Sequence, residues 1–208
     1  LGGNSLLATQ LVSRVGAAID ARVPVREVFE ASTVGALAAR AAGRAGEGGR
    51  LTLGMRERPA RVPLSFAQQR MWFIDQFDTA SAVYNMPLAL RLSGELDVAA
   101  LQAAVADVLD RHEVLRTVYP SDETGPVQVV VPVEAVGVDL SPVAVAEAEL
   151  MQRVGQVLGA GFDVAAAVPV RARLLRVGDQ EHVLAVAVHH IAADGSSMRP
   201  LARDVMAA

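Results

Sequence analysis

The chain has 208 residues, of which 52% are hydrophobic and 4% aromatic, and its formal net charge is −4. This length predicts one or two domains with enough apolar residues to form a core. The sequence contains no cysteine, which excludes disulfides, thiolate metal sites and a cysteine nucleophile. The basic residues are scattered arginines and give no electrostatic argument for a nucleic-acid partner. Neither a membrane-length apolar run nor a signal peptide is visible. We therefore expect a cytoplasmic protein and, because the chain starts at Leu1, a piece of a longer one.

Residues 1–42 predict a small unit of three short helices. The first helix carries apolar residues at every fourth position, namely Leu7, Leu11 and Val15. The second is expected over residues 25–30, and the third begins after a cap at Ser32 or Thr33. Three short helices give a marginal core, so we expect a further helix to precede them.

Residues 43–60 are rich in glycine and charge, which is typical of an interdomain linker. Residues 61–208 predict a mixed α and β domain. The expected helices cover residues 65–76, 97–109, 143–158 and 196–206. The expected strands cover residues 87–92, 114–119, 127–131, 170–177 and 182–188, and the last two are joined as a hairpin.

An apolar strand followed by two histidines is the most distinctive feature of the chain. Residues 182–188 are almost entirely apolar, which predicts a central strand buried on both faces. His189 and His190 follow directly, and Asp194 and Gly195 come after a short loop. Because adjacent strand residues point to opposite faces, only one histidine can face a given pocket. This alternation disfavours a metal chelated by both histidines, and it favours one reactive and one buried histidine.

Imidazole is the usual general base in proteins because its ordinary pKa lies near 6.5. We expect Asp194 to pair with an arginine, and Gly195 permits a ligand to approach the main chain closely. The helix that follows offers main-chain N–H groups to a developing oxyanion. A purely structural histidine pair at a strand end is the alternative at this point.

Three segments together resemble the condensation domains of nonribosomal peptide synthetases. The His-His-x-x-x-Asp-Gly motif at residues 189–195 is shared with the wider chloramphenicol-acetyltransferase-like acyltransferases. Residues 65–73, Ser-Phe-Ala-Gln-Gln-Arg-Met-Trp-Phe, resemble the first condensation motif, with Met71 where leucine is common. Residues 111–117, Arg-His-Glu-Val-Leu-Arg-Thr, match the second motif. The three motifs occur in the order of the family, and they are similar to the subtype that joins an L-configured donor to an L-configured acceptor.

The resemblance implies a role for each motif residue. His190 would assist attack of an acceptor amine on a donor thioester, either as a base or by orienting the amine, and His189 would be structural. Asp194 would hold the loop through an ion pair with a buried arginine, and Gly195 would lie near the reacting carbonyl. The supporting residues implied by the second motif are Arg111 and Arg116. Ordinary helix-end charge is the alternative for Arg111.

The first six residues, Leu-Gly-Gly-Asn-Ser-Leu, resemble the attachment motif of peptidyl carrier domains, with Asn4 where histidine is frequent. The resemblance implies that Ser5 carries 4′-phosphopantetheine as a phosphodiester, added by a phosphopantetheinyl transferase. An exposed hydroxyl at a helix N-terminus suits this chemistry because helix N–H groups lie near the phosphate. A simple N-cap role is the alternative for Ser5.

The implied organisation is the C-terminal part of a carrier domain at residues 1–42, a linker at 43–60 and the N-terminal lobe of a condensation domain at 61–208. The implied fold class is α+β, with a small helical carrier remnant followed by one chloramphenicol-acetyltransferase-like α/β sandwich lobe. In the family, two such lobes enclose the active site. We therefore expect this chain alone to be inactive or nearly so.

The implied function is amide bond formation by an acyltransferase within a parent synthetase that makes a secondary metabolite such as an antibiotic. The implied partners are carrier-bound aminoacyl or peptidyl thioesters, the neighbouring adenylation and downstream carrier domains, and the phosphopantetheinyl transferase. Neither nucleic acid nor a membrane is among them. Two other functions compete with this one, a freestanding acyltransferase that uses a diffusible thioester and a non-catalytic module that recruits partners.

Overall fold

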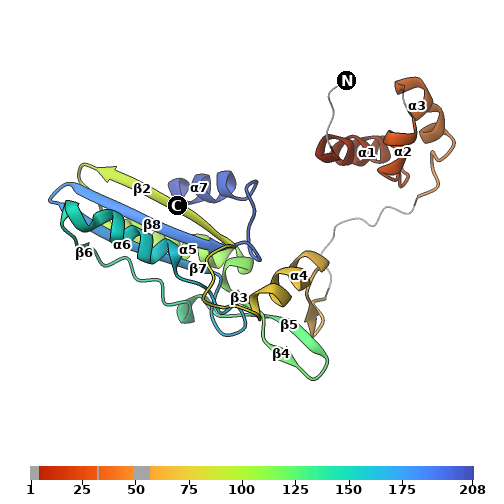
Figure 1. The fold of residues 1–208 in the computed structure, drawn as a ribbon. Coiled ribbons are helices and arrows are strands. Elements are labelled where there is room, and N and C mark those ends of the chain that lie inside the picture. Colours follow the sequence, from red (N-terminus) through yellow and green to blue (C-terminus); the bar gives the residue numbers. More distant parts are fainter. Residues whose placement is uncertain (1–4, 32, 49–56) are drawn as a thin grey trace. The chain divides into compact units, whose positions relative to one another are not determined.

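The computed structural model describes residues 5–31, 33–48 and 57–208 (Figure 1). The chain divides into two compact units, Leu1–Glu57 and Arg58–Ala208. The attachment motif before Ser5 and the possible cap at Ser32 lie outside the described residues, and so do residues 49–56 of the expected linker.

The smaller unit consists of the three predicted helices. They are α1 (Ser5–Ile19), α2 (Arg26–Glu30) and α3 (Val34–Ala42). The Thr33 side chain accepts a hydrogen bond from the Ala36 amide at 3.2 Å, so it caps α3. The buried residues of this unit are mostly small, which gives a thin core. They include Ala8, Val12, Ala21, Val23, Ala31 and Ala41.

The first part of the expected linker folds back onto these helices. The Gly46 amide donates to the Ile19 carbonyl at 2.9 Å, and Gly48 forms a bridge with Ala21. Arg44 pairs with the buried Glu27 at 2.7 Å. Residues 43–48 are therefore held to the helical unit by several contacts.

The larger unit is built on a four-stranded sheet with the order β2-β8-β7-β6 (Figure 1). Its strands are β2 (Asn85–Ser93), β8 (Glu181–His189), β7 (Val170–Gly178) and β6 (Val143–Ala144). All neighbours are antiparallel except β6 and β7, which are parallel. The central strand β8 pairs along its whole length, and Asn85 of β2 lies opposite His189.

Helices cover both faces of this sheet. Helix α6 (Glu147–Gly159) packs on one face, where Leu150 and Val154 contact Val183. Helices α5 (Val98–Arg111) and α7 (Met198–Ala207) pack on the other face around Val188. Residues of β8 therefore contribute to the clusters on both faces of the sheet. The strand is buried on both sides, as its apolar sequence predicts.

A smaller sheet and helix α4 lie beside one end of the main sheet (Figure 1). The elements here are β1 (Val62–Pro63), α4 (Phe66–Asp75), the 3-10 turn η1 (Glu113–Arg116), β3 (Thr117–Val118), β4 (Ser121–Asp122), β5 (Gly125–Val130) and the 3-10 turn η2 (Val133–Ala135). Strand β5 pairs with β1, β3 and β4. Around this end, Leu64, Tyr119 and Phe162 form one core cluster with Ile191.

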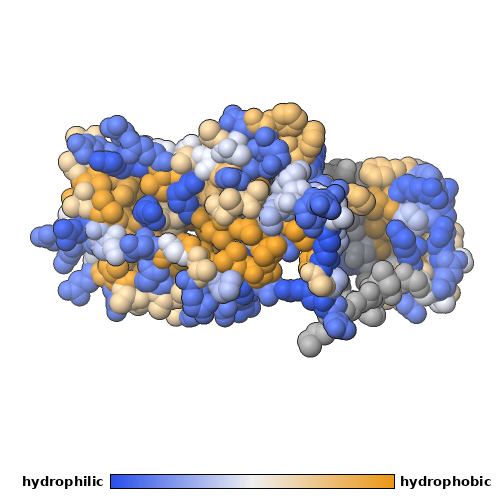
Figure 2. All heavy atoms as spheres, turned by 90° about the horizontal axis from the view of Figure 1, so that it is seen from below, coloured by the Kyte–Doolittle hydropathy of each residue, from blue (hydrophilic) through white to orange (hydrophobic). Residues whose placement is uncertain are grey.

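The α+β fold class is confirmed by this architecture of two sheets and covering helices. The larger unit seen in Figure 2 has apolar residues gathered near its middle and hydrophilic residues around them. In the part of the chain that the structure describes, no helix is both long enough and apolar enough to span a membrane.

Two predicted elements were wrong in part. Residues 114–119 were expected to be a strand, but η1 occupies Glu113–Arg116 and the strand β3 begins at Thr117. The Thr117 hydroxyl donates to the Glu113 carbonyl at 2.7 Å, which stabilises this tight turn against the local β-propensity. The helix expected from residue 143 starts at Glu147, because residues 143–144 pair with β7 as β6.

Candidate active site

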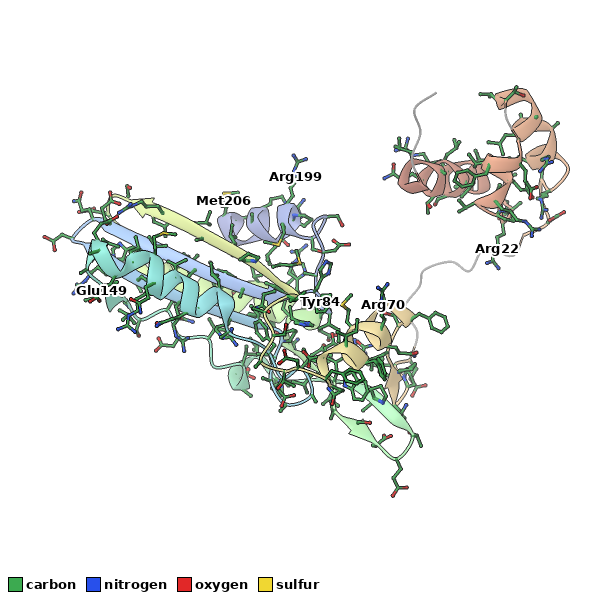
Figure 3. All side chains as sticks on the ribbon, in the orientation of Figure 1. Arg22, Arg70, Tyr84, Glu149, Arg199 and Met206 are labelled. Atoms are coloured by element: carbon green, nitrogen blue, oxygen red, sulfur yellow. The ribbon has the colours of Figure 1, made fainter. Side chains whose placement is uncertain are left out.

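The two adjacent histidines occupy different environments. Strand β8 ends at His189, which is 2% exposed, and His190 is exposed in the turn that follows. The turn is closed by the Ala192 amide, which donates to the His189 carbonyl at 3.0 Å. The His190 amide donates to the Tyr84 carbonyl at 2.9 Å, just before β2. Figure 3 labels Tyr84 near the start of β2, at the end of the sheet next to α4. The main chain of His190 is thus fixed while its imidazole is accessible.

The main chain and the ring of buried His189 both have polar contacts. Its amide donates to the Pro169 carbonyl at 2.9 Å, and its Nδ1 accepts from the Ile191 amide at 3.2 Å. Its Nε2 lies 3.8 Å from Oδ1 of Asp75, the last residue of α4. Burial, with a contribution from His190, lowers the pKa of His189 to about 4. His189 is therefore neutral at pH 7 and part of the core.

Asp194 holds its own loop, and among the described residues it forms no ion pair with an arginine. Its Oδ1 accepts hydrogen bonds from the amides and the hydroxyls of both Ser196 and Ser197, at 2.6–3.0 Å. The Asp194 amide donates in turn to the Ser197 hydroxyl at 3.1 Å. These hydrogen bonds lower the pKa of Asp194 to about 2. Asp194 thus occupies the amides of Ser196 and Ser197, just before α7, so these two groups are not open to an oxyanion.

Gly195 has open space where a side chain would be. A Cβ built there meets no other atom within 4 Å. Close by, a cleft of about 350 Å³ brings the second and third motifs together. Its lining includes His112, Val114 and Leu115 from the second motif and Ala192, Ala193, Ser196, Ser197, Pro200 and Leu201 from the third motif and α7.

The two arginines of the second motif differ. Arg116 is largely buried and donates to the carbonyls of Leu109, Val131 and Asp110 at 2.9, 2.9 and 3.1 Å. Arg111 has 69% of its side chain exposed and lies 3.4 Å from Asp204 of α7. Arg116 therefore joins the end of α5 to Val131, the residue after β5, and Arg111 behaves as a helix-end charge.

The first motif forms α4 and its capping box. The Ser65 hydroxyl accepts from the Gln68 amide at 3.2 Å, and the Gln68 side chain accepts from the Ser65 amide at 2.9 Å. Trp72 donates from Nε1 to the Tyr119 carbonyl at 2.8 Å and packs on the cluster that contains Ile191. Helix α4 is thereby fixed beside the turn of His190.

Sequence reasoning missed three contacts of this site. Asp75 and Tyr84 meet the histidine pair from α4 and from the residue before β2. His112 hydrogen-bonds through Nε2 to Oδ2 of Asp204 at 2.8 Å, which ties the second motif to α7. All three contacts join residues that are far apart in sequence, so no local sequence pattern predicts them. Within the described ranges, no group of three acidic or histidine side chains is placed to hold a metal ion.

Ser5 is the first residue of α1, and the first turn of this helix contains no acidic residue. The positive end of the helix dipole is therefore not offset by a carboxylate at this position. A phosphodiester on Ser5 fits this end of the helix.

Comparisons with known proteins agree with the two units. The family model described as "Condensation domain" matches residues 59–208, and the one described as "Phosphopantetheine attachment site" matches residues 1–41. The chain is 50% identical over its whole length to the "Probable non-canonical nonribosomal peptide synthetase (NRPS) CymA" of Salinispora arenicola. It is 40% identical over 99% of its length to the "Dimodular nonribosomal peptide synthase" of Bacillus subtilis. The chain spans only 3% and 8% of the length of these two relatives.

Two solved structures resemble most of this chain. The teicoplanin X-domain, in its complex with OxyB, matches 76% of this chain and 34% of its own with a TM-score of 0.70 and 41% identity. The starter condensation domain of rhizomide synthetase RzmA matches 71% of this chain and 36% of its own with a TM-score of 0.61, and at 21% identity it supports the fold alone.

The family models thus cover both the sheet that carries the histidine turn and the helical unit that begins with Ser5. The second of them indicates that 4′-phosphopantetheine is the covalent cofactor of the N-terminal unit. The chain belongs to the condensation-domain family of nonribosomal peptide synthetases, with a phosphopantetheine attachment region ahead of the condensation domain.

Proposed function

We propose that His190 takes part in amide bond formation between two carrier-bound substrates in a nonribosomal peptide synthetase. The observation that carries this proposal is the exposed imidazole on a turn whose main chain is fixed by Tyr84 and by the His189 carbonyl. A catalytic group needs this combination of access and fixed position.

In the proposed reaction, the nitrogen of an acceptor amine attacks the carbonyl carbon of a donor thioester. The new C–N bond forms, the C–S bond breaks, and the sulfur leaves with the donor's carrier. His190 accepts the proton that the amine loses, or orients the amine, and the leaving sulfur receives a proton as thiol. His189 holds the turn, Asp194 holds the loop, and the open space at Gly195 leaves room for the reacting carbonyl. Arg116 supports the site from a distance, and Arg111 contributes through α7.

We assign attachment of 4′-phosphopantetheine to Ser5. When bound, this group supplies a thiol that carries an aminoacyl or peptidyl group as a thioester. Ser5 is the first residue of α1. Treatment of the chain with a phosphopantetheinyl transferase and coenzyme A is expected to add one group to the intact mass. Ser5→Ala removes this addition, whereas Ser13→Ala, on an exposed position of the same helix, keeps it.

We further propose the domain limits 1–42 for the carrier part, 43–60 for the linker and 61–208 for the N-terminal lobe of the condensation domain. The partners are an adenylation domain, a downstream carrier and the transferase, in the cytoplasm. A second lobe completes the site in the parent protein, so the chain alone has little or no activity. Robust amide formation by the chain alone, with carrier-bound thioester and amine, argues against this arrangement.

The decisive experiment measures amide formation by the complete synthetase that contains this sequence. His190→Ala is expected to lower the turnover rate at least about 100-fold. Arg199→Ala changes an exposed arginine of α7 and is expected to leave the rate unchanged (Figure 3). Wild-type turnover by His190→Ala contradicts the proposal.

A recruiting module is the second candidate, because the X-domain neighbour at 41% identity was solved in a complex with OxyB. A recruiting role predicts that His190→Ala keeps both binding and turnover in the parent. A freestanding acyltransferase instead predicts turnover with a diffusible thioester and no dependence on Ser5.

A further inference from the structure

Asp75 is a buried carboxylate next to the candidate active site, and neither the motifs nor the proposed reaction uses it. It ends α4 and is 6% exposed. Its Oδ2 accepts a hydrogen bond from the Val164 amide at 3.3 Å, and its Oδ1 lies 3.8 Å from Nε2 of His189. Burying a carboxylate is costly unless it has polar partners, and burial raises the pKa of Asp75. A buried carboxylate at this position is therefore a candidate for a functional role.

The contacts of His189 determine which of its nitrogens carries the proton. Nδ1 accepts a hydrogen bond from the Ile191 amide at 3.2 Å, so Nδ1 keeps its lone pair. The neutral imidazole must then carry its proton on Nε2. Nε2 is the nitrogen that faces Asp75. At 3.8 Å this contact is longer than a direct hydrogen bond, and the carboxylate acts through its charge in a poorly solvated place.

The hydrogen bond from the Ile191 amide to Nδ1 of His189 also stabilises the turn that contains His190. The Ile191 amide follows His190 directly, and the His189 carbonyl accepts from Ala192 at 3.0 Å. If the proton moved to Nδ1, the Ile191 amide would face a second donor and lose its partner. A buried amide without a partner is unfavourable, so the turn would rearrange.

We propose that Asp75 is a positioning residue for His190. By facing the Nε2–H of His189, Asp75 selects the tautomer whose Nδ1 binds the Ile191 amide, and this keeps the turn that presents His190 in place. Helix α4, which carries the first motif and ends at Asp75, thus supports the third motif through a buried carboxylate. This inference rests on the proposed role of His190 in amide formation.

The primary variant is Asp75→Asn in the complete synthetase that contains this sequence. The asparagine has the same shape and keeps an acceptor for Val164, but it removes the charge that faces Nε2. Displacement of a reacting group by about 1 Å costs about 100-fold in rate, so we expect a fall of about 10- to 100-fold in kcat. The KM for the carrier substrates is expected to stay within about twofold, because Asp75 is buried. The matched control is Asp78→Asn, which changes an exposed aspartate three residues later that accepts from the Ala80 amide.

A second measurement is independent of turnover. Nitrogen NMR of the 208-residue chain labelled at histidine reports the tautomer of His189 at pH 7. The wild-type chain is expected to show the proton on Nε2, and Asp75→Asn is expected to show an increased Nδ1–H population. Asp78→Asn is expected to match the wild type.

The outcomes separate the two proposals. Loss of turnover in both His190→Ala and Asp75→Asn, together with the tautomer change, supports the inference. If His190→Ala is inactive while Asp75→Asn matches Asp78→Asn in kcat, Asp75 is not a positioning residue. An Nδ1–H tautomer in the wild-type chain also overturns the inference, whether or not any variant folds. Full turnover by His190→Ala overturns the proposed function, and the inference with it.

Discussion

His189 and His190 are neighbours in sequence, yet His189 is 2% exposed inside the core and His190 lies on the surface of the next turn. The strand β8 ends between them, so the chain changes from a buried extended segment to a turn within one peptide bond. A buried ring at His189 and an exposed ring at His190 should therefore differ in what they contribute to stability.

We predict that alanine substitution affects stability at only one of these positions. His189→Ala removes a buried ring and leaves the Ile191 amide without its partner, so the free energy of unfolding should fall by about 2–3 kcal/mol. His190→Ala should change it by less than about 0.5 kcal/mol. Urea unfolding followed by fluorescence is a suitable measurement, because the single tryptophan, Trp72, lies in the larger unit. Equal destabilisation by the two variants contradicts the structure.

A second prediction concerns the two arginines of the second motif. Arg116 binds three carbonyl groups and only 12% of its side chain is exposed, so Arg116→Ala should destabilise the larger unit by about 2–3 kcal/mol. Arg116→Lys should recover little of this loss, because an ammonium group cannot reproduce the planar fork of guanidinium donors. The same urea experiment measures both.

Arg111→Ala is the matched control from the same motif. Its side chain is 69% exposed, and Asp204 keeps His112 and Arg203 as partners, so loss of this pair should cost only about 0–1 kcal/mol. A larger loss for Arg111→Ala than for Arg116→Ala would show that the buried contacts of Arg116 do not stabilise the unit.

Much of the fold follows from local patterns. The Asp97 cap and the apolar stripe predict α5, and the Asp97 side chain does accept from the Ala100 amide at 2.9 Å. The apolar run before the histidines predicts a central strand, and β8 is one. Local propensity fails where tertiary contacts are stronger, as at residues 114–116. There Arg116 binds the end of α5, and a turn replaces the expected strand.

The candidate site was predicted less completely than the fold. The histidine motif is readable because its residues are close in sequence, and the strand geometry separates the two rings. The sequence suggested a distant arginine as the partner of Asp194, whereas among the described residues the serines two and three positions later bind it. Asp75 could not be assigned from sequence, since its contact with His189 exists only after α4 packs beside β8.

A third prediction concerns pH. Burial lowers the pKa of His189 to about 4, and an unfolded histidine has a pKa near 6.5. Between these values the unfolded chain binds more protons than the folded one, so stability is lost as pH falls from about 6.5 towards 4. The raised pKa of Asp75 acts in the opposite direction, because protonation of that carboxyl favours the folded state.

Comparison with His189→Asn isolates the contribution of the histidine. The unfolding free energy of the wild type is expected to fall more steeply between pH 7 and pH 5 than that of the variant. Urea titrations of both proteins at these two pH values measure the difference. Parallel slopes would mean that His189 titrates normally in the folded chain, which conflicts with its burial.

The last prediction concerns two glycines that differ in their surroundings. A Cβ at Gly161 would collide with the main chain of Thr79 and Ala80, in the loop between α4 and β2. This loop leads to Tyr84, whose carbonyl holds His190, so its packing against Gly161 supports the candidate site. Main-chain atoms cannot move aside as a flexible side chain does. Gly161→Ala should therefore cost about 1–3 kcal/mol of stability and lower turnover in the parent synthetase.

Gly155 is the matched control because it lies exposed inside α6, where an added Cβ meets no atom within 4 Å. Alanine is favoured over glycine in a helix interior, so Gly155→Ala should stabilise the larger unit by about 0.5–1 kcal/mol. The two variants add the same methyl group. Opposite changes in the free energy of unfolding would show that Gly161 is needed for the close approach of the loop at residues 79–80, and that the loss of a glycine is not by itself destabilising. Stabilisation by Gly161→Ala would mean that this loop does not pack as closely in solution, and the support that it gives to His190 through Tyr84 would then be lost as well.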